Sequence, residues 1–324
     1  MSATPDHAAR IETALAAGSA VRDAVVASWQ RSKHLHHLDP GRGSAPERLS
    51  ARELSLTRER LGSFLQTAKA SLDQLYLAVG NAGCCVLLAD KNGIPVARRG
   101  ARADDRIFDK WGLWTGALWS EDSEGTNGIG TCIVEERALT VHKDQHFHSK
   151  NIEMSCTAAP IFDHEGKLLA AVDVSSCRAD LTAGFSNLIS IGVVNAAQAI
   201  ETAHFRQFYS TSRILLAAPA NQVDTPGPAL IAIDRDDLVI GATRQARRIY
   251  GLVDKDFKNP VPLSTLFGQD VDEADDYTKA GRRTVLLALA RSGGNVSAAA
   301  SSMGISRATL HRKIKRLGIQ FKAN

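Results

Sequence analysis

The 324-residue sequence predicts an α+β fold, in which a mostly antiparallel sheet flanked by helices precedes an all-α module at the carboxyl end. Two observations predict it. Short apolar runs separated by turn residues recur between residues 84 and 174, with long amphipathic segments on either side. Residues 277–324 then differ in character, because they are strongly basic and their apolar residues recur at helical spacing. A chain of this length can hold two domains and an additional short module.

Two helical segments are predicted at the start of the chain. Residues 7–33 are amphipathic, and residues 47–78 form a second, longer amphipathic segment. We assign residues 1–77 to an N-terminal helical region. The apolar face of the first segment consists of Ile11, Leu15, Val21, Val25, Val26 and Trp29.

The apolar pattern changes from helical to strand-like after residue 78. Residues 84–90 are expected to form a buried strand, and Lys91-Asn92-Gly93 after it predicts a hairpin. A long helix is expected over 184–208. We assign residues 78–210 to one sensor-like domain with an antiparallel sheet between helices. Its further strands are expected at 139–141, 157–162 and 168–174, with a turn at 163–166 joining the last two.

An aromatic stretch with Phe108, Trp111, Trp114 and Trp119 lies between the expected strands. Aromatic walls with a few polar groups suit a small-molecule pocket, but tryptophans also fill cores, and composition favours neither alternative. The glycines of residues 125–130 follow. They lack the spacing and the Lys-Ser/Thr of a phosphate-binding P-loop, so we interpret them as a tight loop beside the pocket.

The spacing of His142, His146 and His148 is compatible with metal ligation, with Cys156 nearby in sequence. A non-haem iron site is one interpretation, and a loop ordered by His146 with two surface histidines is the other. The same residues suggest a Cys–His nucleophile, but nothing in the sequence orients such a pair. We therefore predict no metal, no cofactor and no enzymatic activity. The five cysteines include no CxxC pair and are expected to be reduced thiols.

Residues 211–276 are expected to be a linker. Residues 226–251 within it predict a strand, a turn at Asp234–Asp237, a second strand and a helix. This order resembles the opening of a PAS domain, and too few residues follow to complete one. The acidic stretch after it is interpreted as a solvated spacer or as a shield for the basic module. That stretch contains Asp270, Asp272, Glu273, Asp275 and Asp276.

The charge of the chain is concentrated at one end. Residues 277–324 contain no Asp or Glu and ten Lys or Arg, although the whole chain carries only +4. Residues 1–276 are left with 29 basic and 35 acidic side chains, a net charge of −6. A one-sided basic module of this kind is the electrostatic footprint of a protein that binds the phosphate backbone of nucleic acid.

Three helices are predicted in this module, at 282–291, 296–303 and 307–317. Asn295 is expected to cap the second helix and Ser306 the third, and Gly304 supplies the turn between them. In the third helix Leu310, Ile314 and Leu317 face inward and leave the basic residues outside. Two helices joined by a tight glycine turn, with the second helix cationic, predict a helix-turn-helix.

The third helix and its cap supply the candidate DNA contacts. We expect Ser306, Arg307 and His311 at base edges, with Arg307 reading guanine. Thr309, Arg312 and Lys315 are better placed for phosphates. The alternative is a solvated basic helix at the end of the chain.

This module resembles the C-terminal DNA-binding domain of the Fis family, which bacterial enhancer-binding regulators share. The resemblance implies a homodimer that places one recognition helix of each copy in the major groove of an inverted-repeat operator. The matching residues are Gly294-Asn295, Ala298-Ala299, Met303-Gly304-Ile305, Ser306–Leu310 and Lys313–Ile319.

Residues 20–210 resemble the GAF domain of the acetoin-catabolism type of sigma-54-dependent activators. The resemblance implies an N-terminal domain that senses a small-molecule effector, without fixing which one. It is carried by Ser28–Ser32, Leu38–Pro40, Trp119–Glu121, Gly125–Thr131, Gln145–Phe147, Ser155–Asp163 and Leu168–Ser175. The effector-binding candidates are Trp111, Trp114, Trp119, Glu121, Thr126, Asn127, His146 and Cys156.

The activators that the chain resembles carry an ATPase domain between sensor and helix-turn-helix, but no P-loop motif occurs in this sequence. We therefore expect a one-component regulator that acts by occlusion or by recruitment of RNA polymerase, without hydrolysing ATP. Two alternatives are an architectural DNA-binding protein whose GAF domain only dimerises, and an iron or redox sensor. No membrane span or secretory signal is seen, so a cytoplasmic location is expected.

Overall fold

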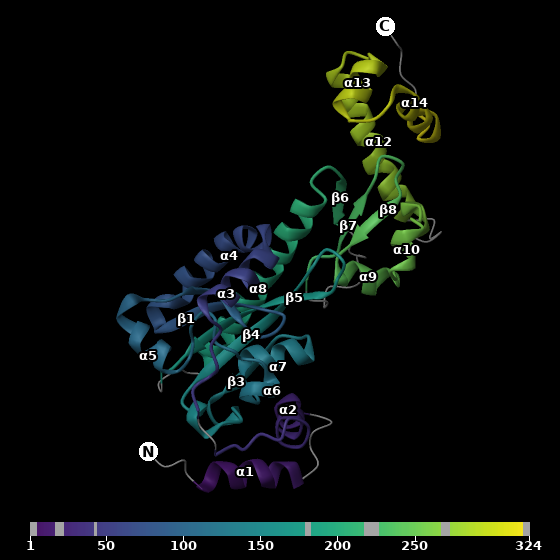
Figure 1. The fold of residues 1–324 in the computed structure, drawn as a ribbon. Helices are drawn as coiled ribbons and strands as arrows, with labels where there is room; N and C mark the ends of the chain where they lie inside the picture. The colour runs from purple at the N-terminus through teal and green to yellow at the C-terminus, as the bar shows by residue number, and fades with distance from the viewer. Residues whose placement is uncertain are drawn as a thin grey trace. The chain divides into compact units, whose positions relative to one another are not determined.

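A computed structural model describes residues 5–16, 23–41, 44–178, 183–216, 227–266 and 273–319 (Figure 1). They form two compact units. The first contains the described residues of 1–210, 216–230 and 242–249, and the second those of 211–215, 231–241 and 250–324. No helix within these described ranges has the length and apolarity needed to cross a membrane.

The first unit is built on a five-stranded antiparallel sheet with the strand order β2-β1-β5-β4-β3. The expected strands and both hairpins are confirmed. Each hairpin begins with an aspartate whose Oδ1 accepts two backbone N–H groups of the turn: Asp90 from Asn92 and Ile94, and Asp163 from Glu165 and Lys167. The strands are β1 (Cys84–Asp90), β2 (Pro95–Arg99), β3 (Leu139–His142), β4 (Ser155–Phe162) and β5 (Leu168–Ser176).

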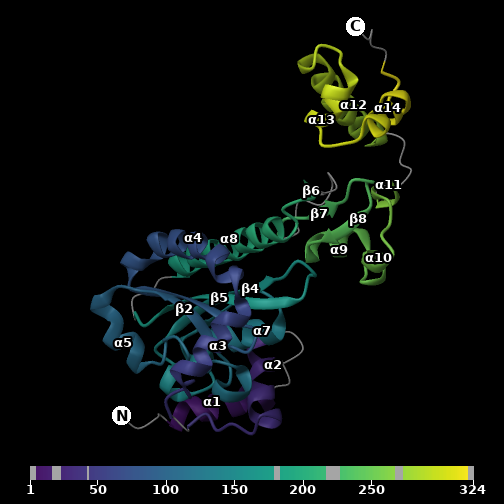
Figure 2. The ribbon, with the colours of Figure 1, turned by 45° about the horizontal axis from the view of Figure 1, so that its top comes forward.

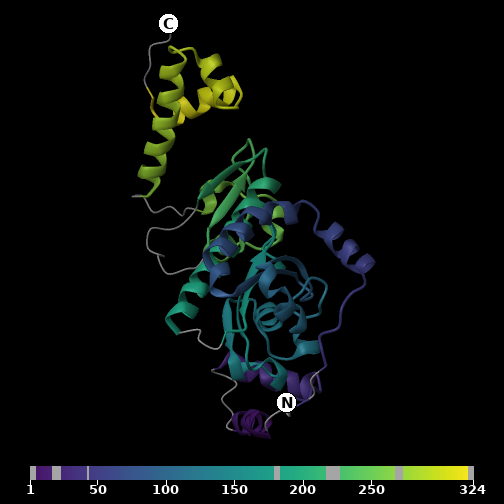
Figure 3. The same ribbon diagram turned by 90° about the vertical axis from the view of Figure 1, so that its left-hand side faces the viewer.

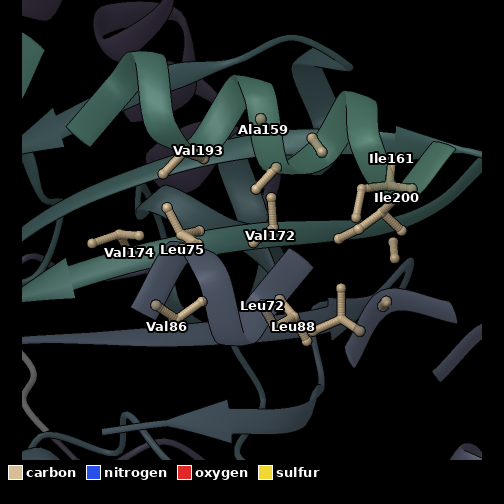
Figure 4. Close-up of a cluster of buried hydrophobic side chains, with 14 of the residues drawn as sticks. Leu72, Leu75, Val86, Leu88, Ala159, Ile161, Val172, Val174, Val193 and Ile200 are labelled. Carbon is tan, nitrogen blue, oxygen red and sulfur yellow. The ribbon is translucent and has the colours of Figure 1, made fainter. Parts of the chain in front are cut away.

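Two helices, α4 (Ser63–Val79) and α8 (Ala183–Phe208), cover one face of this sheet. Figure 4 shows their apolar side chains meeting those of β1, β4 and β5 in one cluster. Burying one such leucine, isoleucine or valine stabilises the fold by about 1.5–3 kcal/mol. The labelled members are Leu72, Leu75, Val86, Leu88, Ala159, Ile161, Val172, Val174, Val193 and Ile200.

The segment predicted as one helix over 47–78 is two helices. The first, α3 (Ala51–Leu61), begins with a capping box between Ser50 and Glu53. Gly62 then adopts a φ of 49°, which breaks the helical path before α4 begins. The expected helix over 7–33 is likewise divided, into α1 (Pro5–Ala16) and α2 (Ala24–Gln30), and α2 continues as the π-helical turn η2 (Arg31–Leu35). Val21 of the predicted apolar face lies outside the described residues.

The opposite face of the sheet carries short helices and the chain between them. Figure 2 shows α5 (Asp105–Lys110) and α7 (Gly128–Glu135) on the side of the sheet away from α4 and α8. A further short helix, α6 (Glu121–Glu124), precedes α7. This face is packed by a second apolar cluster around Phe108 and Trp119. The 3₁₀ turns of the unit are η3 (Gly80–Ala82), η4 (Arg102–Asp104), η5 (Lys143–Gln145) and η6 (Ser149–Asn151).

A small three-stranded sheet follows, with β6 (Arg213–Leu216), β7 (Leu230–Ile233) and β8 (Val239–Ala242) in that order. The turn predicted at Asp234–Asp237 is confirmed, because Asp234 Oδ1 accepts the N–H groups of Asp236 and Leu238 at 2.8 and 2.9 Å. The expected order of strand, turn, strand and helix is present. The helices after it are α9 (Arg244–Tyr250), α10 (Lys255–Lys258) and α11 (Leu263–Leu266).

Three helices end the described chain: α12 (Glu273–Arg291), α13 (Val296–Ser302) and α14 (Arg307–Arg316), drawn in yellow in Figure 3. The first of them begins nine positions earlier than the predicted Arg282. Glu273, Asp275 and Asp276 are therefore helical rather than part of a spacer, and Asp270 and Asp272 lie outside the described residues. Acidic residues suit the first turn of a helix, because its unpaired N–H groups carry partial positive charge.

Candidate functional site

The carboxylate of Glu121, at the start of α6, is buried and paired. The Arg31 guanidinium donates from Nε to Oε1 at 2.5 Å and from Nη2 to Oε2 at 3.1 Å, and Ser28 Oγ donates to Oε2 at 2.6 Å. Glu121 is 2% exposed, and its hydrogen bond raises the pKa of Arg31. Ser28 and Arg31 were not selected as site residues from the sequence, although they lie in the motif 28–32 that carries the resemblance.

The hydroxyl of Ser28 joins two further predicted residues into the same cluster. It lies 2.7 Å from Thr126 Oγ1 and 3.1 Å from Thr131 Oγ1, and all three hydroxyls are buried. Helix α2 therefore contributes to the interior of the first unit. Trp29 strengthens this attachment, since its indole N–H donates to the carbonyl of Gln145 at 2.8 Å.

Gly128 and Gly130 belong to the start of a helix, so the interpretation of the stretch as a tight loop is wrong for these two glycines, whereas Gly125, with a φ of 62°, lies in the turn before the helix. Asn127 caps α7, with its Oδ1 accepting the N–H of Gly130 at 2.8 Å. A Cβ on Gly128 would lie 2.6 Å from Cys156 Cβ and 2.7 Å from Asp173 Oδ1. The glycine therefore lets α7 approach the sheet closely, and this requirement outweighs the low helix propensity of glycine.

A chain of buried polar groups crosses β4 and β5 beneath α7. The imidazole of His146 donates from Nδ1 to the carbonyl of Lys143 at 2.8 Å, and its Nε2 lies 3.4 Å from Cys156 Sγ. Ser175 Oγ lies 3.1 Å from the same sulfur and donates to Asp173 Oδ2 at 2.6 Å. The other oxygen of Asp173, Oδ1, has no hydrogen-bond partner among the described residues.

Burial sets the protonation of this chain. It lowers the pKa of His146 to about 4, raises that of Asp173 to about 7, and raises that of the Cys156 thiol well above its usual range. At neutral pH the imidazole is uncharged and the thiol keeps its proton. A protonated thiol beside a neutral imidazole lacks the thiolate that cysteine nucleophiles require.

The three histidines considered for metal ligation do not form a site together. His142 Nδ1 contacts Ser155 Oγ at 2.7 Å, whereas His146 is engaged with Lys143 and Cys156. His148 is buried, which lowers its pKa to about 4. Within the described part of the chain, no three or more His, Cys, Asp or Glu side chains are grouped to hold a metal ion.

The predicted tryptophans have different environments. Trp119 is 1% exposed, and its indole N–H donates to the carbonyl of Gly112 at 2.8 Å, so it packs the core beneath α5 and α7. Trp111 is half-buried at the edge of the same cluster. Trp114 is also half-buried, but its ring faces the guanidinium of Arg98, with Cζ 4.1 Å from the ring centroid.

The carboxyl-terminal helices form a separate core, into which α14 turns Leu310 and Ile314. Both predicted caps are present. Ser306 Oγ accepts the N–H of Thr309 at 3.1 Å, and Asn295 Oδ1 accepts the N–H of Ser297 at 3.0 Å. The turn between the helices contains Gly304 with a φ of 66°. The inward face and the tight turn fix how α14 is presented.

The outward face of α14 is cationic. Arg307, His311, Arg312 and Lys315 are exposed, and no acidic side chain in the described ranges pairs with the three basic ones. Thr309 is half-buried, with its hydroxyl 2.9 Å from that of Ser306. The structure thus brings the six predicted DNA-contact residues together on one helix. Two of them, Ser306 and Thr309, also hold its first turn.

Residues 63–200 match the GAF domain family, and residues 282–317 match the family described as bacterial regulatory protein, Fis family. The chain is 32% identical over 293 residues to the Acetoin catabolism regulatory protein of Cupriavidus necator, covering 87% of this chain and 43% of that protein. It is 28% identical over 155 residues to the Acetoin dehydrogenase operon transcriptional activator AcoR of Bacillus subtilis, covering 48% and 26%. The chain thus spans less than half the length of these two relatives.

Among solved structures, the fold is similar to that in the crystal structure of the E. coli DhaR(N)-DhaL complex. The TM-score is 0.50 at 18% identity, over 71% of this chain and 76% of that one. At this identity the likeness extends to the fold alone.

Proposed function

We propose that this chain, which carries a GAF domain and a Fis-type helix-turn-helix, is a one-component regulator of transcription. In this proposal α14 binds operator DNA, and the GAF domain senses a small molecule that changes the binding. The similarity to proteins named as regulators of acetoin catabolism supports a regulatory role. Regulation by an effector is our extension of that role.

The observation that carries the proposal is the cationic outward face of α14 on a helix that its caps and core hold firmly. Arg307 lies in the first turn, where a recognition helix meets base edges, and we propose that it reads guanine through a bidentate contact. Arg312 and Lys315 lie further along the helix and are proposed to contact phosphates. Their charges are available for DNA because no described acidic residue neutralises them.

A homodimer is proposed as the binding species, because two recognition helices spaced on an inverted repeat give affinity that one cannot. Candidate contacts are apolar side chains exposed on the outer side of α4 and α8. Leu77 is 78% exposed, Leu188 65% and Ile191 59%. We expect the double change Leu188→Asp and Ile191→Asp to produce monomers in light scattering, while Leu216→Asp, at an equally exposed position outside these helices, leaves the dimer intact.

Effector control is proposed to act through the sheet of the first unit. The buried chain from His146 to Asp173 lies on one face of β4 and β5, and α8 packs on the other face of the same strands. An effector can shift the equilibrium between two dimer geometries only by binding one of them more tightly. The eight effector-binding residues named from the sequence remain a proposal. Within it, the ring of Trp114 faces the guanidinium of Arg98, and Cys156 is joined to Asp173 through the hydroxyl of Ser175. Nε and Nη2 of Arg98 and Oδ1 of Asp173 have no hydrogen-bond partner among the described residues.

We also propose that the chain does not hydrolyse ATP itself, since its sequence contains no P-loop. Regulation would then act by occluding a promoter or by recruiting RNA polymerase. Measuring ATP turnover with and without DNA tests this directly. Turnover above background that follows the protein through purification would contradict it.

The experiment that tests the proposal as a whole is fluorescence anisotropy on operator DNA selected from a random library by the full-length chain. We expect a specific site with inverted-repeat symmetry, an affinity that falls steeply with salt, and a change in affinity with at least one small molecule. Equal binding to all sequences would favour an architectural protein. Sequence-specific binding that no small molecule alters would refute the sensor half of the proposal.

A further inference from the structure

Arg98 lies on β2, on the face of the central sheet away from α4 and α8. It is paired in register with Leu87, which belongs to the apolar cluster around Phe108 and Trp119. The next residue, Arg99, is on the other face, where its Nε donates to Asp73 of α4 at 2.5 Å. Two neighbouring arginines thus point to opposite sides of one sheet, and only Arg98 is on the side that carries the buried polar chain.

The guanidinium of Arg98 is enclosed. Its side chain is 11% exposed, and Cζ lies 4.1 Å from the ring centroid of Trp114 and 5.5 Å from that of Phe108. Nη1 donates to Asp105 Oδ1 at 2.8 Å. Nε and Nη2 are buried and have no acceptor among the described residues. Leaving a buried charged donor unsatisfied is costly, so these two groups point to a ligand.

The two unpaired donors share one edge of the guanidinium. Nε–H and Nη2–H project in parallel from the same side of its plane, and their spacing matches the two oxygens of a carboxylate. In the same unit, a protein carboxylate binds Arg31 in this way: Nε and Nη2 of Arg31 donate to the two oxygens of Glu121 at 2.5 and 3.1 Å. In Arg98 no carboxylate of the described residues meets the corresponding edge, and Asp105 occupies only Nη1.

We propose that Arg98 binds the carboxylate of the effector, and that the effector is a small organic acid. The inference rests on the proposed sensing function and specifies its ligand. The carboxylate meets Nε and Nη2 in a bidentate contact, and the carbon skeleton lies toward the ring of Trp114. Asp105 holds the guanidinium in place from its other side. Gly100 lies directly against the guanidinium, since a Cβ there would be 2.6 Å from Nη2 and would displace it.

The test uses the full-length protein and monocarboxylates from acetate and lactate to benzoate, each paired with its primary amide at constant ionic strength. The amide has the size of the acid but neither its charge nor its second acceptor oxygen. Binding is followed by the thermal shift of tryptophan fluorescence, because all four tryptophans lie between residues 29 and 119. We expect at least one acid to stabilise the protein and its amide to fail. If no acid binds, or if an amide binds as tightly as its acid, the inference is overturned without any variant.

Variants then locate the contact. We expect Arg98→Gln, and Arg98→Lys, which keeps the charge without the fork, to weaken acid binding about 10- to 100-fold. Gly100→Ala should weaken it less, by displacing Nη2. Arg99→Gln is the matched control on the opposite face and should bind like the wild type. Unchanged acid affinity in a folded Arg98→Lys protein would overturn the assignment. Loss of acid binding in both Arg98 variants and in the Arg99→Gln control would indicate a general defect of the protein and would also overturn it.

Operator binding separates this inference from the proposed function. If a neutral compound, and no acid, changes operator affinity, the proposed regulatory function is supported and the proposed carboxylate site is rejected. If an acid binds through Arg98 and operator affinity does not change, the carboxylate site is supported and the proposed control of DNA binding by an effector is rejected.

Discussion

The first unit, which we propose to be the sensor, and the carboxyl-terminal module place their ionisable side chains in opposite environments. In the sensor, Glu121, Asp173 and His146 are buried and act on groups a few ångströms away within the fold. In the module, Arg307, Arg312 and Lys315 of α14 are exposed, and the helix is held by apolar contacts and neutral caps. Changing a buried charge strongly affects the stability of the fold. Changing an exposed charge affects it little, and an exposed charge remains available to a binding partner. Each prediction below tests one side of this contrast.

The largest effect is expected at the Arg31–Glu121 pair. Arg31→Ala leaves a 2%-exposed carboxylate without its counter-ion, which should reduce the free energy of unfolding of the sensor by about 3–5 kcal/mol. Urea denaturation followed by tryptophan fluorescence measures it. The control is Arg48→Ala, whose ion pair with Asp109 is exposed and should cost only about 0–1 kcal/mol. Similar losses of unfolding free energy in both variants would contradict the expected difference between a buried and an exposed ion pair.

In the module, the apolar side chains should dominate stability. Leu310 is fully buried, so Leu310→Ala should cost about 2–5 kcal/mol and abolish operator binding by unfolding α14. Circular dichroism during thermal unfolding should show loss of a helical transition, with the tryptophan transition of the sensor unchanged. His311→Ala, one position along on the exposed face, should leave the helical transition in place. A stable, helical Leu310→Ala module would contradict the role given to this core.

Asp173 should make its own contribution to the pH dependence of stability in the first unit. Because burial raises its pKa from 3.8 to about 7, the folded state keeps a proton that the unfolded state loses as the pH rises above about 4. Stability from this group is therefore lost as pH rises toward 7 and is constant above it, a fall of about 2–3 kcal/mol between pH 5 and 7. Asp173→Asn should remove this contribution, which is measured as the difference between the pH slopes of the wild type and the variant in urea denaturation series.

A residual slope is expected in that variant from Glu201, whose pKa burial also raises to about 7. His146 and His148, whose pKa values burial lowers to about 4, contribute in the opposite direction between pH 5 and 7. Equal pH slopes in the wild type and in Asp173→Asn would therefore show that Asp173 is ionised in the fold.

The smallest effect on stability, and a specific one on binding, is expected at Arg307. Arg307→Ala should weaken operator binding by about 1–3 kcal/mol and relax the preference at one base position, with sensor and helical stability unchanged. Arg312→Ala is the comparison, since a phosphate contact should weaken all sequences alike and reduce the salt slope by about one. If Arg307→Ala weakens binding equally for all DNA sequences, Arg307 contacts the phosphate backbone of the DNA and not a base.

What could be predicted from the sequence was mostly local. The strands of the sheet, the Asx turns after β1 and β4, and the caps Asn295 and Ser306 each follow from neighbouring residues, and the structure contains them. The helix α7 was missed because its glycines are required by tertiary contacts: Gly128 lies against Cys156 and Asp173, which are distant in sequence, and Gly130 lies against the backbone of Trp119 and Glu121. The Arg31–Glu121 pair, 90 positions apart, was missed for the same reason.

The candidate site shows the same division. The residue types at Trp114, His146 and Cys156 suggested a site, but their partners Arg98, Lys143 and Ser175 depend on strand register and on how a loop folds back. Composition gave no reason to separate Arg98 from Arg99. Only the alternation of side chains along β2, fixed by pairing with β1, places one of them toward the aromatic side.

The family match to the GAF domain starts at residue 63, whereas the counter-ion of Glu121 is Arg31, the first residue of η2. A fragment that begins at the family boundary would leave the carboxylate of Glu121 without its counter-ion. It would also lack Ser28, whose hydroxyl contacts those of Thr126 and Thr131. The natural unit for expression and ligand screening therefore begins well upstream of the recognisable domain, and poor solubility of shorter fragments would reflect where they were cut.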